Sequence, residues 1–395
     1  MKDLLEEVRG LAYLCLNCGA CTAAFGPFTP ICPAGERFGF NAYFSRGRAL
    51  IAQGLAEGRL KWTEGLVKLL YECTGCGGCT SQCPSYYAEH ATLVIEALRA
   101  EAVRRGLGPL TRQRWADHVA SEGNPYFEPA HQRLSWLPPD EKASLPRRAK
   151  IVYFVGCTAS YRQREVAQAT YSLLKEAGLD FTILEGEVCC GSPLLRTGQW
   201  DVVKRLAERN IKAVEEARAE LLVTSCAGCY RTWTLDYAKQ YRSRLGIPSY
   251  SFEVLHITQL LVKLLREGSL RLNEVRARVA YHDPCHLGRH SGVYEEPRLL
   301  IESIPGVELL EMERNRENTW CCGAGGGVKA GFPEWALEVA VKRLREAEGV
   351  GAEILTTSCP FCKRNLSDAA KATGSKLKVL DVVELVARAV GDQRG

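Results

Sequence analysis

The sequence contains no run of about 18 apolar residues, and neither sign of charge predominates. The first absence argues against a direct membrane span, because a helix that crosses a bilayer needs about 20 such residues. Lys and Arg number 51 and Asp and Glu 46, so neither nucleic acid nor an anionic membrane surface is an expected partner. The first residues, MKDLLEEVRGLAYLC, lack the apolar core of a signal peptide. We therefore expect a cytoplasmic protein, at most peripheral on the inner face of the membrane through a partner.

Cysteine, in contrast, is abundant: the chain has 395 residues and 18 cysteines. At roughly 150 residues per domain, this length predicts two to three domains. The cytosol keeps thiols reduced, so disulfides are not the expected use of these cysteines. Their grouping into short motifs indicates metal ligands instead.

The second part of the chain is an internal repeat. The first copy runs through KIVYFVGC, EVCCGSP and AELLVTSCAGC, and the second through RVAYHDPC, TWCCGAGG and AEILTTSCPFC. Within the first copy, the strand-like runs IVYFV, FTIL and LLVTS alternate with helical patterns near Arg164–Ala177 and Val202–Ala217. Such alternation predicts a small parallel sheet with right-handed crossovers, and the cysteine groups follow the carboxyl ends of its strands.

These patterns predict an α+β multidomain protein in which a helical domain precedes two repeated α/β domains. We expect the helical domain at residues 1–104, an irregular linker at 105–148, and the repeats at 149–268 and 269–395. The linker contains GNPYFEPAHQRLSWLPPDEKASLPRR, which is rich in Pro and aromatic residues. SFEVLHITQLLVKLLREG, before the second repeat, is expected to be an amphipathic helix whose apolar stripe faces the core rather than a partner.

The N-terminal cysteines have ferredoxin spacing. Cys73, Cys76, Cys79 and Cys83-Pro84 follow C-x2-C-x2-C-x3-C-P, in which three thiolates hold one cubane cluster and the fourth ligates the other. An earlier set keeps the first two spacings but has ten residues, TAAFGPFTPI, before its last cysteine. Crossed ligation predicts one [4Fe–4S] cluster on Cys15, Cys18, Cys21 and Cys83, and another on Cys32, Cys73, Cys76 and Cys79. A structural zinc site is the alternative, but the CxxCxxC runs and Cys-Pro endings suit it poorly.

About 40 residues separate the two ferredoxin motifs, and the segment near Gly39–Leu70 has a helical pattern. This arrangement resembles the helical ferredoxin domain of succinate dehydrogenase-type iron–sulfur subunits. The segment includes Ser45-Arg46-Gly47-Arg48, whose charges we expect to be solvated, with partner docking or cluster tuning as alternatives.

Each repeat offers five cysteines. The two sets are Cys157, Cys189, Cys190, Cys226 and Cys229, then Cys285, Cys321, Cys322, Cys359 and Cys362. Adjacent cysteines do not easily ligate one iron of a cubane together, so five thiolates indicate an unusual cluster. Gly191, Gly323 and Gly325 would let the backbone approach the cluster sulfides and donate N–H bonds. A phosphate-binding loop is the weaker interpretation, since the glycine run lacks the Lys and the spacing of a P-loop.

The doubled CCG and CxxC motifs, with YHDPCHLGRH and CCGAGGG, resemble the cysteine-rich CCG family. That family includes subunits of heterodisulfide reductase and the iron–sulfur subunits of glycolate oxidase and anaerobic glycerol-3-phosphate dehydrogenase. A helical ferredoxin ahead of two CCG units is similar to the D-type subunit of heterodisulfide reductase. The resemblance implies two [4Fe–4S] cubane clusters and two noncubane [4Fe–4S] clusters, the latter facing one substrate disulfide.

By this resemblance we expect an oxidoreductase: an electron-transfer subunit whose cubane clusters feed noncubane clusters that reduce a disulfide. Disulfide reduction also requires protons. His282, His286 and His290 flank Cys285 and titrate near neutral pH, so they are candidate proton donors. Capping a strand end or hydrogen-bonding cluster sulfurs is the alternative for these histidines. Lys329 is a weaker candidate for binding an anionic substrate, and ordinary surface charge is its alternative.

The competing function is a non-catalytic electron relay for a flavin-dependent 2-hydroxyacid or glycerol-3-phosphate dehydrogenase. No G-x-G-x-x-G fingerprint follows a predicted strand, so any flavin or haem is expected on a partner. The resemblance implies a cytochrome b, a flavin oxidase or an electron-transfer flavoprotein as that partner. Two intact five-cysteine motifs favour the reductase, since a relay would tolerate the loss of one.

Overall fold

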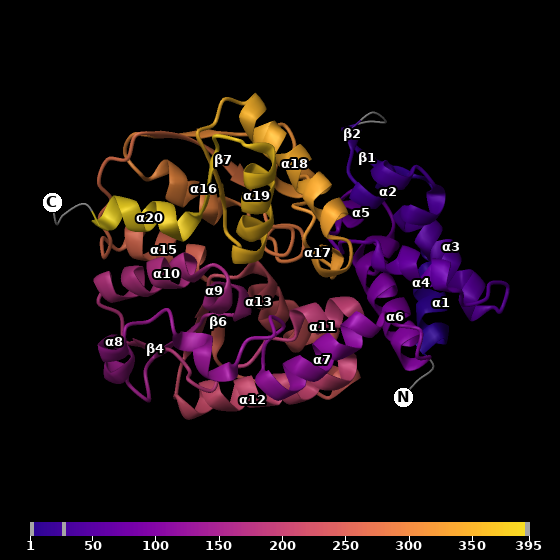
Figure 1. The fold of residues 1–395 in the computed structure, drawn as a ribbon, viewed down its shortest axis with the longest axis horizontal. Helices are drawn as coiled ribbons and strands as arrows, with labels where there is room; N and C mark the ends of the chain where they lie inside the picture. The colour runs from indigo at the N-terminus through magenta and orange to yellow at the C-terminus, as the bar shows by residue number, and fades with distance from the viewer. Residues whose placement is uncertain (1–3, 26–28, 392–395) are drawn as a thin grey trace.

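The computed structural model describes residues 4–25 and 29–391 and arranges them as a helical N-terminal region beside two stacked α/β repeats (Figure 1). Residues 26–28, within the ten-residue spacer before Cys32, lie outside the described residues. The described N- and C-terminal ends lie on opposite sides of the molecule. The expected α+β class is confirmed, with two four-stranded parallel sheets, one in each repeat.

The N-terminal region is built from short helices around one buried helix, α6. Its elements are α1 (Leu4–Ala12), η1 (Ala20–Thr22), β1 (Ala23–Ala24), β2 (Thr29–Pro30), α2 (Pro33–Phe38), η2 (Asn41–Tyr43), α3 (Ser45–Ala56), α4 (Glu64–Tyr71), α5 (Gly78–Ser81), η3 (Tyr86–Glu89) and α6 (Ala91–Arg104). From Ala91 to Ala102 every residue of α6 is buried, on all sides of the helix. A helix that is buried on all sides packs against several parts of the protein at once.

The first repeat is a parallel sheet with strand order β4-β3-β5-β6. β3 (Ile151–Phe154) is buried throughout, as is usual for a parallel strand covered on both faces. The remaining elements are α9 (Cys157–Tyr161), α10 (Arg164–Glu176), β4 (Phe181–Thr182), α11 (Ser192–Thr197), η5 (Trp200–Val202), α12 (Val203–Glu216), β5 (Leu221–Thr224), α13 (Ala227–Arg231), the π-helix η6 (Thr232–Gln240), α14 (Arg242–Leu245), β6 (Glu253–His256) and α15 (Ile257–Arg266).

The second repeat has the same strand order, β8-β7-β9-β10 in its own numbering, so the internal repetition of the sequence corresponds to a repetition of topology. Its elements are β7 (Ala277–His282), α16 (Glu295–Glu302), β8 (Val307–Leu310), η7 (Arg316–Asn318), α17 (Val328–Gly331), α18 (Pro333–Gly349), β9 (Ile354–Thr357), α19 (Pro360–Thr373), β10 (Lys378–Asp381) and α20 (Val382–Gly391). In each repeat the first cysteine and the CxxC pair follow the carboxyl ends of the two central strands.

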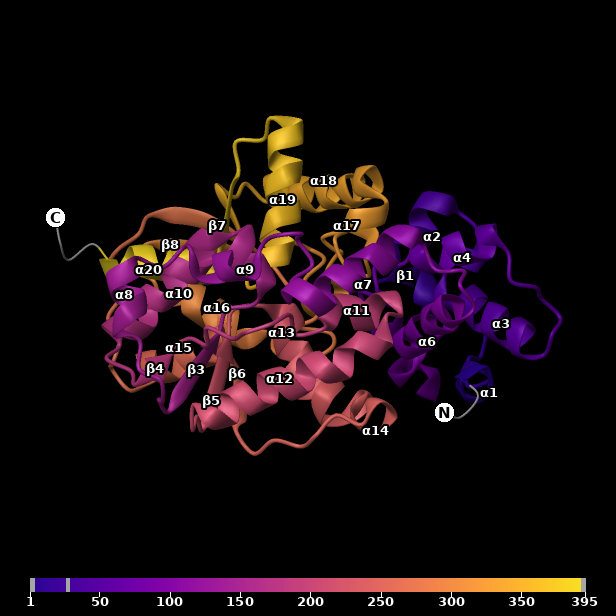
Figure 2. The same ribbon diagram turned by 60° about the horizontal axis from the view of Figure 1, so that its bottom comes forward.

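The two repeats share a hydrophobic core. α10 packs on α20 and α15 packs on α16, so Leu174 and Leu261 of the first repeat belong to one buried cluster with Leu300 and Val386 of the second. Figure 2, turned by 60°, shows α10 and α20 side by side at the same end of the molecule. This shared core fixes the position of the carboxyl end of one sheet relative to that of the other.

Two expectations about local structure need correction. Residues 105–148 are not wholly irregular, since they contain α7 (Leu110–Glu122), η4 (Ala130–Leu134) and α8 (Pro139–Ser144). The stretch predicted as one helix before the second repeat begins with β6, which pairs in parallel with β5, and only then continues as α15. The apolar side of α15 does face the core, as expected. The domain boundaries themselves remain a prediction.

Within residues 4–25 and 29–391, none of the helices combines the length and the apolar character that crossing a membrane requires.

Candidate metal centres and the cavity between them

The first ferredoxin-type group contains cysteines from both motifs. The thiol of Cys15 interacts with Cys83 and Cys18, and burial is the main cause that raises the pKa of Cys15. Cys21 interacts with Cys15. Cys18 is exposed, so this group lies at the surface of the N-terminal region.

The second group surrounds Cys32. Burial of the Cys32 thiol raises its pKa to about 12. Cys73 and Cys76 interact with it, and so does Cys79. The ten-residue spacer contains β1 and β2, which pair antiparallel, and Cys32 follows β2 as the N-cap of α2. The pairing of β1 with β2 accommodates the longer spacing, and Cys32 lies near Cys73, Cys76 and Cys79. Crossed ligation itself remains a prediction.

Backbone N–H groups already point at several cysteine sulfurs. Gly35 donates to Cys32 Sγ at 3.4 Å and Gly75 donates to Cys73 Sγ at 3.4 Å. Such N–H···S bonds stabilise a thiolate that carries the charge of a metal cluster.

The expectation of solvated charge at Ser45-Arg46-Gly47-Arg48 is wrong for Arg48, which is 1% exposed. Its guanidinium donates to the Glu72 carbonyl at 3.3 Å. Burial opposes the charge of Arg48, but the attraction of Cys73 and Cys32 outweighs it and raises the pKa. Arg46 interacts with Cys21 of the other group. The two arginines therefore interact with different cysteine groups. Gly47 lies between them in the sequence, and a Cβ at this position would meet the Asn41 carbonyl oxygen at 1.9 Å.

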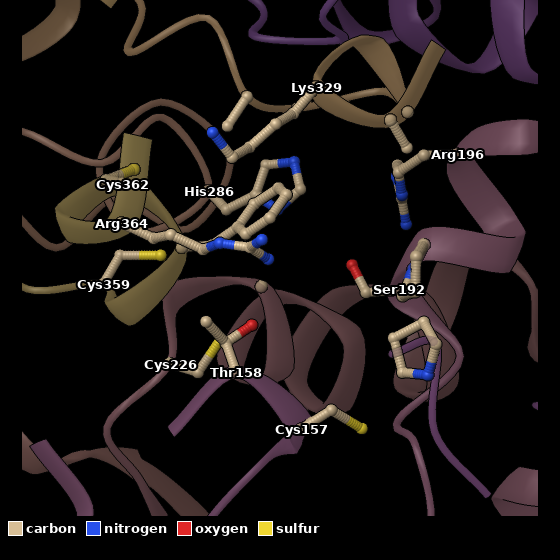
Figure 3. A pocket seen from close by; sticks show the side chains of 18 of the residues that line it. Cys157, Thr158, Ser192, Arg196, Cys226, His286, Lys329, Cys359, Cys362 and Arg364 are labelled. Carbon is tan, nitrogen blue, oxygen red and sulfur yellow. The ribbon is translucent and has the colours of Figure 1, made fainter. Parts of the chain in front are cut away.

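The cysteines of the two repeats converge on one cavity of about 610 Å³. Nine of the ten line it, namely Cys157, Cys189, Cys190, Cys226, Cys229, Cys285, Cys322, Cys359 and Cys362. Figure 3 shows Cys157 and Cys226 on one side of this space and Cys359 and Cys362 on another, with His286 and Arg364 between. The expectation that both five-cysteine groups meet at the sheet ends agrees with this geometry.

Thiol contacts connect the second ferredoxin group to the two repeats. A hydrogen bond with the Cys321 thiol is the largest of the causes that raise the pKa of Cys76, so the second ferredoxin group touches the second repeat. The thiols of Cys226 in the first repeat and Cys359 in the second interact across the cavity. The inner ferredoxin group, that of Cys32, Cys73, Cys76 and Cys79, therefore contacts the second repeat, which in turn contacts the first repeat.

The glycines beside the cysteine pairs differ in what they do. Gly191 donates to Cys189 Sγ at 3.4 Å and Gly323 donates to Cys321 Sγ at 3.3 Å. Gly325 instead packs against the N-terminal region, where a Cβ would meet the Thr74 carbonyl oxygen at 2.5 Å. The first two donate to cysteine sulfurs, donation to cluster sulfides remains a prediction, and Gly325 permits a close approach to the N-terminal region.

The structure separates the three candidate histidines, and only His286 lines the cavity. His286 Nε2 accepts from Arg231 at 3.1 Å, while His290 Nε2 donates to the Gly75 carbonyl at 3.1 Å. Burial, followed by repulsion from Arg231, keeps the pKa of His286 well below its usual value. His286 is therefore neutral near pH 7, with its proton on Nδ1.

The cationic side chains of the cavity differ in how they are compensated. Lys329 donates to Asp368 at 2.5 Å and to Asn365 at 2.7 Å. Arg364 stacks on Tyr126, 5.3 Å from the ring centroid, and pairs with no carboxylate among the side chains that the structure describes. Arg364 is thus the more available anion-binding group, although the sequence pointed only to Lys329.

Buried arginines behind the cysteines were not foreseen from the sequence. Arg133 donates to Glu187 at 2.7 Å and to Cys157 Sγ at 3.5 Å. Arg343 donates to His282 Nδ1 at 3.1 Å. Sequence carries no signal for these contacts because each partner comes from a different element.

The residues present fit iron–sulfur clusters. All 18 cysteines are free thiols, and the ten of the repeats, except half-buried Cys285, are buried. Buried thiolates with N–H donors aimed at them form a soft ligand set, which suits iron–sulfur clusters or zinc better than hard cations.

Comparison with known families supports clusters of iron and sulfur. Residues 11–86 match the 4Fe–4S dicluster domain, and residues 151–233 and 279–367 each match the cysteine-rich domain. These matches cover the two ferredoxin motifs and both copies of the repeat.

Among curated proteins, the chain is 39% identical to the D-type subunit of dihydromethanophenazine:CoB–CoM heterodisulfide reductase from Methanosarcina barkeri, over 95% of this chain and 93% of that one. It is 34% identical to the B-type subunit of fumarate reductase (CoM/CoB) from Methanothermobacter marburgensis, over 98% and 73%. It is 29% identical to EtfAB:quinone oxidoreductase from Syntrophomonas wolfei, over 81% and 46%. Of the solved structures, a hypothetical protein from Helicobacter pylori resembles it in fold alone, with a TM-score of 0.61 at 9% identity, over 88% and 68%.

Proposed function

Because the chain belongs to the family of cysteine-rich iron–sulfur oxidoreductases that includes the D-type subunit of heterodisulfide reductases, we propose that it reduces a disulfide in the cavity between its repeats. The convergence of nine repeat cysteines on one cavity carries this proposal. The reaction is R–S–S–R′ + 2 e⁻ + 2 H⁺ → R–SH + R′–SH, with the electrons supplied by a redox partner. A cytochrome b, a flavin oxidase or an electron-transfer flavoprotein is the proposed donor.

Four clusters are proposed. Two are cubane [4Fe–4S] clusters, one on Cys15, Cys18, Cys21 and Cys83 and one on Cys32, Cys73, Cys76 and Cys79. The other two are noncubane [4Fe–4S] clusters, each on the five cysteines of one repeat. When bound, they supply electrons one at a time and a surface to which a sulfur of the substrate can attach.

Side chains of the cavity are proposed to handle charge and protons. Neutral His286 holds its proton on Nδ1 and donates a hydrogen bond to a developing thiolate, while Arg231 fixes its ring from the other side. Arg364 is proposed to bind an anionic substituent of the disulfide, because its guanidinium lines the cavity and forms no ion pair with a carboxylate of the described residues. Gly191 and Gly323 hold the cysteine pairs with their N–H groups.

The direct test is an anaerobic assay of cluster-loaded protein with reduced viologen and a panel of disulfides. We expect turnover of at least one disulfide that carries a carboxylate, sulfonate or phosphate group. No turnover by protein with intact clusters would favour the alternative, an electron relay for a flavin-dependent 2-hydroxyacid or glycerol-3-phosphate dehydrogenase. The similarity to EtfAB:quinone oxidoreductase favours that alternative.

The cluster assignment has its own test in iron and acid-labile sulfide analysis. About 16 irons are expected for four clusters of four, and zinc without sulfide would contradict the redox function. Cys189→Ala and Cys322→Ala should each disturb one noncubane cluster and leave the cubane signals in the spectrum. An unchanged spectrum would show that these two residues are not ligands.

A further inference from the structure

The ring of His282 is held in one tautomer. His282 ends β7 and is 1% exposed. Its Nδ1 accepts from Arg343 Nε at 3.1 Å, and Arg343 is itself fully buried and held by Glu346 at 2.5 Å. A guanidinium can only donate, so Nδ1 carries no hydrogen and the proton of the neutral ring is on Nε2.

The bond to Arg343 leaves Nε2 as the remaining nitrogen of a ring that lies beside cysteines of the second repeat. Nε2 is buried and has no hydrogen-bond partner among the described residues. A ring nitrogen of His282 and the sulfurs of Cys322 and Cys362 lie within 4.8 Å of one another. The neighbouring Cys321 and Cys362 are the largest causes that lower the pKa of the Cys322 thiol, and the nearby His282 ring lowers it further. An unpartnered buried N–H beside two thiols indicates a bond to the group that those thiols hold.

The position of the first repeat that corresponds to His282 is not a histidine. The strand ends YHDPC and YFVGC correspond, so Phe154 occupies the position of His282. Phe154 packs against Trp233 with 5.6 Å between ring centroids. The first site is supplied differently, by Thr232 beside Cys190 and by Arg133 on Cys157. The two five-cysteine sites therefore share topology but differ in their hydrogen-bond donors.

We propose that His282 is the hydrogen-bond donor that sets the reduction potential of the cluster in the second repeat, and of that cluster alone. The inference rests on the proposed function for the presence of that cluster. Because Nε2 is protonated, it has no lone pair for iron, so His282 donates to a sulfur rather than acting as a ligand. A hydrogen bond to a cluster sulfur stabilises the more negative, reduced state and raises the potential.

The placement of the second site explains why such a donor is useful there. Its Cys321 touches Cys76 of the inner ferredoxin group, so electrons from the ferredoxin region reach this site first. A raised potential holds the first electron beside the cavity until the second arrives.

The test is a redox titration of cluster-loaded protein, followed by electron paramagnetic resonance, for His282→Phe, His282→Gln and the wild type. His282→Phe installs the residue of the first repeat, and we expect the potential of one noncubane cluster to fall while the other clusters are unchanged. His282→Gln keeps an N–H donor and should stay near the wild type. Phe154→Leu is the matched control in the other repeat and should shift no potential.

The inference is overturned if His282→Phe leaves all potentials unchanged, or if His282→Gln shifts the potential as far as His282→Phe. If His282→Phe loses one cluster, His282→Gln becomes the deciding variant. Iron content and potential equal to those of the wild type in His282→Gln support the inference, and a lowered potential in that variant contradicts it. The titration needs no disulfide. If the wild type turns over no disulfide while His282→Phe still lowers the potential of one cluster, that outcome would contradict the proposed reaction and leave the role of His282 intact.

Discussion

Single residues decide the charge that a ligand meets in the cavity. Arg162 stacks on Tyr126 at 4.8 Å but is compensated by Glu128 at 2.7 Å. Lys329 is compensated by Asp368. Arg364 shares the Tyr126 ring at 5.3 Å, and stacking leaves the edges of its guanidinium free to donate.

Replacing Arg364 by Gln should therefore weaken anionic disulfides selectively. A hydrogen bond to a charged group contributes about 1.5–3 kcal/mol, so we expect kcat/KM to fall by about 10- to 100-fold for an anionic disulfide. A neutral disulfide should be turned over about as well as before. Arg345→Gln, a change of an exposed arginine on α18, is the control. Equal losses for both kinds of disulfide would contradict the role as an anion anchor.

Among the elements, α6 joins the ferredoxin region to the repeats through buried charges. Its Arg99 donates to the carbonyls of Leu70 at 2.6 Å, Arg196 at 2.6 Å and Gly326 at 3.1 Å, and so contacts three regions. Its Glu96 accepts from Arg196 at 2.7 Å and from the Tyr241 hydroxyl. Removing one partner from such a network leaves a charge buried without compensation.

We expect Glu96→Gln to lower the free energy of unfolding by about 3–5 kcal/mol, the usual cost of breaking a buried ion pair. Anaerobic urea unfolding measures this. Glu208→Gln, which removes an exposed partner of Lys204 on α12, should cost under about 1 kcal/mol. Similar stabilities for the two variants would show that Glu96 is not essential to the junction.

At the scale of the whole molecule, the shared core between repeats decides whether the cavity keeps its shape. Leu174 on α10 is fully buried in the cluster that includes Val383 and Val386 of α20. Both repeats supply cavity wall, so a shift of one against the other would separate Cys226 from Cys359.

Leu174→Ala should destabilise both repeats together, by about 2–5 kcal/mol, because it leaves a cavity in a common core. Hydrogen exchange should then accelerate in α20 as well as in α10. Acceleration confined to the first repeat would show that the repeats unfold independently. Val350→Ala, at a half-buried position after α18, should change neither helix.

Much of the fold could be predicted because its signals are local. α10 and α12 lie within a residue of the predicted helices at Arg164–Ala177 and Val202–Ala217. β6 was missed, since Glu253–His256 becomes a strand only by pairing with β5. The burial of Arg48 was missed for a similar reason. The thiols that favour its charged form belong to Cys73 and Cys32, which are not its neighbours in the sequence.

The sequence by itself determined which cysteines are candidate cluster ligands, because ferredoxin motifs and paired cysteines set their spacing along short stretches of chain. It also determined the repeat and hence the two sheets. Only the tertiary structure decided which groups touch: Cys76 with Cys321, Cys226 with Cys359, and His282 with Cys322 but His290 with the Gly75 carbonyl. Contacts of this kind depend on the packing of elements far apart in the chain, and no local pattern encodes that packing.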